Sequence, residues 1–211
     1  AQGHALGHLP DDNLREIVGH PPASPQAAKL VVGVGTGFNA APVYDTERGR
    51  FVPPSECGHV SLPVWDEVSS HVAAQIRASH GFAAVEEVLS GRGLRTLHAS
   101  LSTEERGAAE IMGALAQRNA TAEAPVRQFI RTLGCVVGDL ALIHLPFGGI
   151  FLAGGVARAM APYLSDHGFV AAMRDKGRFH DFLCQFGVTV VEDDYAALIG
   201  CAAHLTALHL Q

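Results

Sequence analysis

The sequence predicts an α/β fold built on a mixed five-stranded sheet with helices on both faces. Three short apolar stretches broken by turns occupy residues 29–53 and predict a meander of strands. Two further apolar runs of strand length follow at residues 150–153 and 187–191. Between them lie stretches with apolar residues at helical spacing, the longest over residues 124–145. With 211 residues, the chain is long enough for one large domain or two small ones.

The remaining elements follow from periodicity and from start and stop signals. Residues 1–28 are expected to hold helical fragments and a proline-rich connector, and residues 29–211 to form one large lobe. Gly91 is expected to end a short helix, and Thr103 to cap the start of the next one. The helices predicted after the meander cover residues 66–80, 85–91, a segment opening at Thr103, residues 124–145, short segments within 156–185, and residues 195–208. This order of strands and helices resembles one half of the ribonuclease H-like, or actin-like ATPase, fold.

Composition excludes several classes of function. The net charge of −6 and the absence of a Lys/Arg cluster argue against a nucleic-acid partner. No apolar run approaches the roughly 20 residues that span a bilayer, so no membrane partner is expected. The four cysteines (Cys57, Cys135, Cys184 and Cys201) lack C-x-x-C spacing, which predicts neither a zinc site nor a disulfide framework and is typical of a reducing cytoplasm. Residue 1 is Ala and no signal peptide follows, so we expect that the beginning of a longer polypeptide is missing.

Two glycine-rich turns each follow an apolar strand. Gly33-Val34-Gly35-Thr36-Gly37 follows residues 30–32, and Gly154-Gly155 follows residues 150–153. Without a Cβ, glycine lets the backbone approach a ligand closely, so two such turns can grip one nucleotide from two sides. The dinucleotide fingerprint fails because Phe38 stands at its sixth position, and no Gly-Lys-Ser/Thr of a P-loop occurs. An ordinary glycine-rich hairpin remains the alternative for the first turn.

Several longer motifs resemble the bacterial glucokinase family, the non-zinc, hexokinase-like sugar kinases of the actin-like ATPase superfamily. The resemblance is collinear over nearly the whole chain and is carried by Gly35-Thr36-Gly37, Glu56-Cys57-Gly58-His59-Val60, residues 86–94 (EEVLSGRGL), residues 148–155 (GGIFLAGG) and Lys176-Gly177-Arg178-Phe179. It covers the larger, C-terminal lobe of a two-lobe kinase. Residues 1–28 would then be the end of the interlobe helical region and a connector, and the N-terminal small lobe would be absent.

The resemblance implies a sugar site made by Glu56, His59 and Glu86. Carboxylates and an imidazole suit vicinal hydroxyls, because each unmade buried hydrogen bond costs about 1–3 kcal/mol. Taken singly, the Glu and His of the loop would be read as exposed side chains, and Glu86 as a solvated charge at the start of a helix. The motif favours the binding role for all three.

The resemblance also implies a nucleotide site. Gly35, Thr36 and Gly37 would offer backbone amides and one hydroxyl to the β- or γ-phosphate of ATP, while Gly154 and Gly155 would lie flat against the adenosine. Mg²⁺ would be carried mainly by phosphate oxygens and water, and no metal-ligating residue is assigned.

The activity implied is ATP-dependent phosphorylation of glucose, or a related hexose, at the 6-hydroxyl. The Asn-Asp pair whose Asp serves as the family's catalytic base would fall before Ala1, so no residue of this chain inherits that role. The alternatives are a non-catalytic sugar-binding or sensing protein and an actin-type assembly module. The family's tendency to dimerise through this lobe implies a homodimer. Two departures stand out, because Asn39 and Cys57 occupy positions where the family has glycine.

Overall fold

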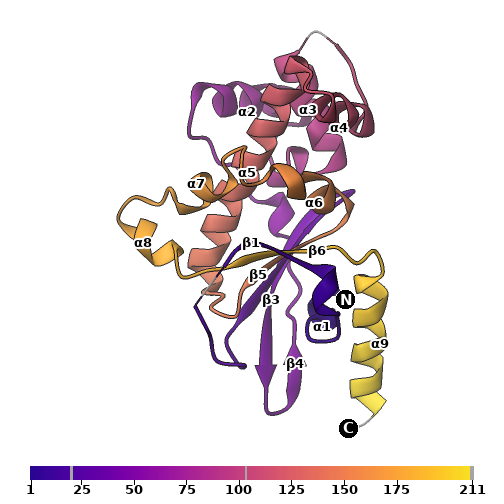
Figure 1. Cartoon of the computed structure of the whole chain (residues 1–211). Helices are drawn as coiled ribbons and strands as arrows, with labels where there is room; N and C mark the ends of the chain where they lie inside the picture. The colour runs from indigo at the N-terminus through magenta and orange to yellow at the C-terminus, as the bar shows by residue number, and fades with distance from the viewer. Residues whose placement is uncertain (20, 103, 210–211) are drawn as a thin grey trace.

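A single mixed sheet in the order β1-β6-β5-β2-β3-β4 organises the chain, as seen in the computed structural model, which describes residues 1–19, 21–102 and 104–209 (Figure 1). Strands β2, β5 and β6 run parallel, whereas β1, β3 and β4 pair antiparallel with their neighbours. The strand bounds are β1 Leu14–Val18, β2 Lys29–Val34, β3 Phe38–Thr46, β4 Gly49–Phe51, β5 Ile150–Ala153 and β6 Val188–Val191.

Helices account for most of the remaining chain. Their bounds are α1 Gln2–Ala5, α2 Glu67–His80, α3 Gly91–Leu101, α4 Ala108–Ala116, α5 Ala120–His144, α6 Gly155–Met160, α7 Phe169–Arg174, α8 His180–Leu183 and α9 Ala196–His209. Single 3-10 turns at Cys57–His59 and Val85–Glu87 lie in the loops that matter for the site. Within the described residues, no helix combines the length and apolar character needed to cross a membrane.

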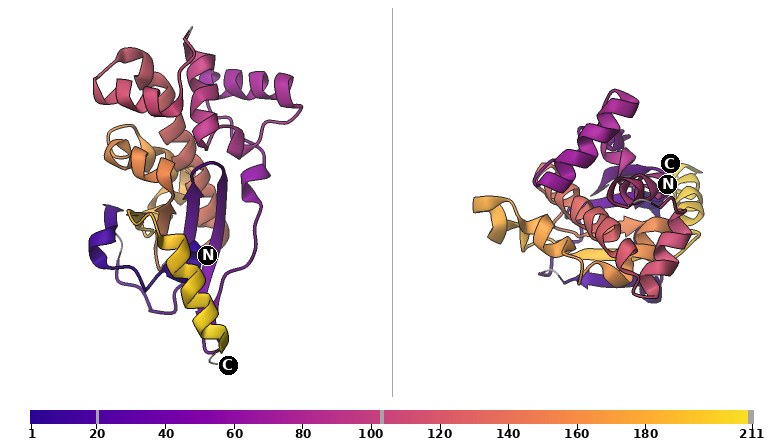
Figure 2. Two further views of the ribbon diagram at one scale, coloured as in Figure 1. Left: turned by 90° about the vertical axis from the view of Figure 1, so that its right-hand side faces the viewer. Right: turned by 90° about the horizontal axis from the view of Figure 1, so that it is seen from above.

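Alternation along the strands gives the sheet two covered faces. Leu30, Val32 and Val34 of β2 point into the larger core, which contains most of the buried residues of α5. Val31, between them, joins a second cluster with Ala5 and with residues of α9. Helices α1 and α9 lie side by side over this second face, and both chain ends are on that side (Figures 1 and 2). The expected mixed sheet with helices on both faces is therefore confirmed.

Three local expectations need correction or fall outside the described residues. The described part of the sheet has six strands instead of five, because residues 14–18, expected among the helical fragments before the proline-rich connector, form β1 against β6. Gly91 begins α3 instead of ending a helix, since the Ser90 hydroxyl caps the new helix by accepting the Gly93 N–H at 3.0 Å. Thr103 lies outside the described residues, and the helix expected to open there begins at Ala108.

The position of the site follows from the parallel pairing of β2 and β5. In this ladder Gly33 lies opposite Ala153, so the two strands end at the same edge of the sheet. The glycine-rich turns that follow these strands are consequently neighbours, although about 120 residues separate them in sequence.

Candidate functional site

The second glycine turn packs directly on the first strand. Gly154 has φ +105°, a backbone conformation that favours glycine. A Cβ at this position would lie 2.5 Å from the Val34 carbonyl oxygen of β2, so a larger residue would separate the two strand ends. Gly154 therefore lets the turn close against β2.

The first turn, residues 35–37, leaves two backbone amides free. The Gly35 N–H donates to the Gly37 carbonyl at 3.0 Å, and the Gly35 carbonyl accepts the Gly91 N–H at 2.9 Å. The amide expected from Gly35 is thus already used inside the turn. Among the described residues, nothing accepts a hydrogen bond from the N–H of Thr36 or Gly37. These two amides can receive anionic oxygens, as in other backbone nests.

Glu86 reaches this turn from the 3-10 turn Val85–Glu87. Its Oε2 accepts the Phe38 N–H at 2.9 Å, while its Oε1 lies 3.8 Å from the Arg92 guanidinium. A Cβ on Gly37 would lie 2.5 Å from the same Oε2, so the absence of a side chain at Gly37 makes room for the carboxylate. Glu86 is half-buried and joins the glycine turn at residues 35–37 to the expected sugar site.

Glu56 and His59 occupy one turn of the adjoining loop. Their side chains are exposed, and His59 Nε2 lies 3.8 Å from Glu56 Oε2. Gly58, between them, packs against β3, because a Cβ there would be 2.2 Å from the Phe38 carbonyl oxygen and 3.4 Å from Glu86 Oε2. The loop is therefore pressed against the strand edge that also contacts Glu86.

These elements surround an open cavity of about 400 Å³. Five of the eight residues predicted for the site line it, namely Gly35, Gly37, Glu56, Glu86 and Gly154. Thr36, His59 and Gly155 do not line it. Thr36 and Gly155 are chain neighbours of residues that do, and His59 Nε2 lies 3.8 Å from Glu56 Oε2. The charged side chains of the lining are the carboxylates Glu56 and Glu86, which suit hydroxyl donors, whereas the free amides of the turn suit an anion.

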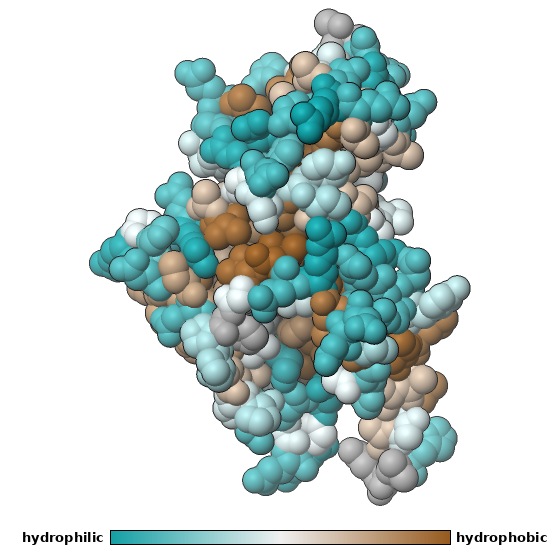
Figure 3. All heavy atoms as spheres, viewed as in Figure 1, coloured by the Kyte–Doolittle hydropathy of each residue, from teal (hydrophilic) through white to brown (hydrophobic). Residues whose placement is uncertain are grey.

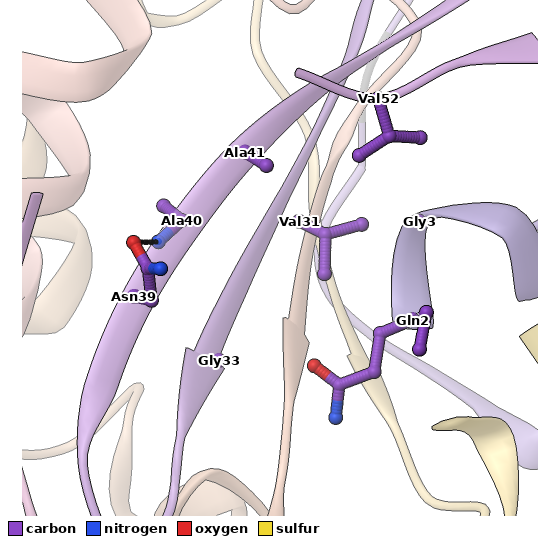
Figure 4. Close-up of a pocket in the computed structure, with 9 residues that line it drawn as sticks. Gln2, Gly3, Val31, Gly33, Asn39, Ala40, Ala41 and Val52 are labelled. Atoms are coloured by element: carbon purple, nitrogen blue, oxygen red, sulfur yellow. Dashed lines mark hydrogen bonds between the residues drawn. The ribbon is translucent and has the colours of Figure 1, made fainter. Parts of the chain in front are cut away.

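Sequence reasoning missed Gln2, which lines this cavity together with Asn39 and with Gly33 of the first glycine-rich turn. Figure 4 shows these three residues, which also line a second pocket of about 200 Å³ next to it, where Gln2 extends from α1 toward the strands. Gln2 carries no motif, so only the packing of α1 on the sheet reveals its position. In the described parts of the chain, no cluster of three or more His, Cys, Asp or Glu side chains could hold a metal ion.

Comparison with known proteins places this geometry in one family. The family model described as Glucokinase matches residues 1–208. A glucokinase of Chromohalobacter salexigens is 31% identical over 97% of this chain, which covers 66% of that protein. The chain therefore spans slightly less than two thirds of the length of this relative.

Solved structures show the same fold. A crystal structure of a glucokinase from an Antarctic psychrotroph aligns with a TM-score of 0.87 and 30% identity, covering 97% of this chain and 66% of that one. A ROK family glucokinase from Streptomyces griseus, solved in complex with glucose and AMPPNP, aligns with a TM-score of 0.53 and 20% identity over 86% of this chain and 61% of that one. At that identity the second likeness shows the fold alone. The expected actin-like architecture is confirmed.

Proposed function

Because the chain belongs to the glucokinase family, we propose that the polypeptide carrying it phosphorylates glucose at the 6-hydroxyl with ATP. In this proposal the chain is the larger, C-terminal lobe, which binds the nucleotide and part of the sugar. Support comes from the match over residues 1–208 and from relatives that extend beyond the matched region.

The observation that carries the proposal is the cavity in which both glycine turns meet two carboxylates. Phosphoryl transfer depends mostly on positioning and on stabilising charge. The free amides of Thr36 and Gly37 would bind phosphate oxygens, and the backbone at half-buried Gly154 and exposed Gly155 would let the adenosine lie close. A protein that only sensed sugar would have no use for the two amides.

The sugar would bind at the carboxylate end of the cavity. Glu56 and Glu86 can accept hydrogen bonds from neighbouring hydroxyls, and His59 would add a donor or acceptor from the same loop. Because Glu86 also holds the Phe38 N–H, it would keep the sugar next to the phosphate turn. This arrangement would bring a hydroxyl and a γ-phosphate together, as catalysis by positioning requires.

The general base is proposed to come from residues that precede Ala1. Gln2 lines the cavity and Ala1 lines the pocket beside it, so a chain leading into Ala1 would pass close to the bound sugar. A carboxylate delivered there could accept the hydroxyl proton, a contribution of typically 10²- to 10⁴-fold in rate.

The remaining features of the proposal concern the metal, the compartment and assembly. Since the described residues hold no metal-ligating cluster, Mg²⁺ would arrive on the phosphate oxygens of ATP. The four free cysteines support a reducing, cytoplasmic location. A homodimer remains a prediction. Helix α9 offers an apolar surface for it, because Leu198 and Leu205 are exposed, and Figure 3 shows brown and tan side chains over this helix.

The test is ATP-dependent phosphorylation by the complete polypeptide on glucose, mannose, fructose and N-acetylglucosamine, with Glu86→Gln beside the wild type. The glutamine can still accept the Phe38 N–H, so the fold is expected to persist. Loss of the charged acceptor should raise the sugar KM or lower kcat at least about tenfold. Glu47→Gln, an exposed carboxylate of the β3–β4 turn, is the matched control and should behave as wild type.

Each result of this assay has a distinct meaning. Turnover with a preference for glucose supports the kinase, and wild-type kinetics in Glu86→Gln would remove that residue from the site. Sugar binding without turnover on any of the four sugars would replace the kinase with a sugar sensor.

A further inference from the structure

The loop segment 55–59 covers a free edge of β3. Within the described ranges of the chain, β4 pairs only with residues 44–46 of β3, so the start of β3 has a strand neighbour on one side alone. On such an edge, every second residue points its N–H outward. The Phe38 N–H is taken by Glu86, and the Ala40 N–H lies 3.1 Å from Cys57 Sγ and 2.8 Å from Asn39 Oδ1. Side chains therefore close this edge where a strand is lacking.

Asn39 and Cys57 make this closure together. Asn39 Nδ2 donates to the Ser55 carbonyl, while its Oδ1 accepts from the Ala40 N–H and from the Cys57 thiol, the latter at 3.4 Å. Ser55 in turn holds the loop, since its hydroxyl accepts the Cys57 N–H at 3.2 Å. Glycine at either position, as in the family pattern, could make none of the side-chain contacts.

Glu56 lies between the two loop residues that are held in this way. Its neighbour on one side is bonded to Asn39 through a carbonyl, and its neighbour on the other side through a thiol. We propose that Asn39 and Cys57 form a coupled positioning pair that holds the loop on both sides of Glu56, keeps this exposed residue at the cavity and thereby sets the affinity for sugar. The effect on sugar rests on the proposed function, whereas the fixing of the loop does not.

The coupling follows from shared partners. Both side chains contact the Ala40 N–H and each other, so removing one changes what the other can do. If Cys57 is absent, Asn39 still holds Ser55; if Asn39 is absent, the thiol retains only its contacts to Ala40. The two substitutions should therefore combine non-additively, as expected for residues in one network.

Asn39→Asp in the complete polypeptide is the sharpest single change. It preserves size but turns the Nδ2 donor into an oxygen that faces the Ser55 carbonyl. We expect the KM for glucose to rise about tenfold, the upper part of the range for one hydrogen bond, with the KM for ATP within about twofold of wild type. A general structural defect would move both constants and the unfolding temperature.

The cycle of Asn39→Gly, Cys57→Gly and the double variant measures the coupling. Each single variant should raise the glucose KM about threefold or more. The fold-rise in glucose KM of the double variant should differ from the product of the two single fold-rises by at least about threefold. Cys57→Ser, which keeps a small polar acceptor, should recover most of the wild-type affinity. Cys184→Ser is the matched control, because this thiol lies just after α8 and, among the described residues, hydrogen-bonds only to the His180 carbonyl at the start of that helix.

Hydrogen exchange of the backbone amides over residues 55–61, followed by mass spectrometry, gives a readout that needs no activity. The segment should exchange faster in Asn39→Asp and Cys57→Gly and unchanged in Cys184→Ser. The proposed coupling would be overturned by unchanged amide exchange or by an unchanged glucose KM in Asn39→Asp. It would also be overturned if the glucose KM of the double variant rose by the simple product of the two single effects. If the wild type neither binds nor phosphorylates any sugar, the proposed function fails, and exchange alone then decides whether the pair fixes the loop. Cys57→Gly, which only deletes atoms, replaces Asn39→Asp if that variant does not fold.

Discussion

Gly35→Ala separates the proposed role of the glycine turn at residues 35–37 in phosphate binding from its role in folding. A Cβ at Gly35 would meet no heavy atom within 4 Å, and Gly35 is not among the glycines with positive φ. The substitution should therefore leave the unfolding free energy unchanged or raise it by about 0.4–1 kcal/mol through the unfolded state. Gly35 lines the cavity of about 400 Å³, so the methyl group is added at the wall of that cavity.

The expected effect on ATP follows from what the methyl group displaces. It would hold a phosphate away from the free amides of Thr36 and Gly37. Losing one hydrogen bond to a charged group removes about 1.5–3 kcal/mol, which corresponds to a rise of about 10- to 150-fold in the KM for ATP. The dissociation constant for glucose, measured without nucleotide, should stay within about twofold.

The assay is steady-state kinetics of the complete polypeptide with ATP varied, combined with thermal unfolding. Gly113→Ala is the matched control, because Gly113 also has open space around it but lies at an exposed position of α4 and does not line the cavity. An ATP KM within twofold of wild type, at an unchanged unfolding temperature, would refute the placement of phosphate at residues 35–37. A large fall in unfolding temperature would instead show that the space is not free.

Two further predictions concern stability. Gly58→Ala should lower the unfolding free energy by about 1–3 kcal/mol in urea titrations, since its Cβ would lie 2.2 Å from the Phe38 carbonyl oxygen; a stability equal to that of the helix α4 control would contradict this contact. Hydrogen bonding from Arg50, assisted by Lys29, lowers the pKa of Asp45 from 3.8 to about 2. A carboxyl whose folded-state pKa is depressed stabilises the fold above its ordinary pKa and loses that contribution as the pH falls, so the stability gap between wild type and Asp45→Asn should shrink by about 1–2 kcal/mol from pH 5 to pH 2. A gap that stays constant over this range would exclude the ion pair as its source.

The sequence predicted the elements that have a clear hydrophobic periodicity or clear turn and cap residues at their ends. The meander over residues 29–53 and the apolar runs at 150–153 and near 187–191 appear as strands, because their apolar content marks a buried sheet. The meeting of the two glycine turns was also predictable, since parallel strands bring their carboxyl ends to one edge. Strand β1 was not, because it has only partly buried or exposed residues and gains its structure by pairing with β6.

Gly91 shows how one residue supports two opposite predictions. A glycine after an apolar helical segment is typical of a helix C-terminus, but the preceding Ser90 is also a favourable N-cap residue. In the structure Ser90 caps α3, so Gly91 begins that helix. The Gly91 N–H then donates a hydrogen bond to the Gly35 carbonyl, which connects the start of α3 to the glycine turn at residues 35–37. The choice is decided by a contact with a residue 56 positions away, which no local pattern contains.

Gln2 was missed for a related reason. Helix α1 is a single turn of 4 residues, too short to be stable alone, so its position depends on tertiary contacts. Arg50 supplies one by donating to the Leu6 carbonyl just beyond α1 while it pairs with Asp45, and Gly200 supplies another, since a Cβ there would overlap the Ala1 carbonyl. The Asp45–Arg50 ion pair and the close approach of α9 therefore help to position α1, and with it Gln2 at the cavity, although Asp45, Arg50 and Gly200 do not line the cavity.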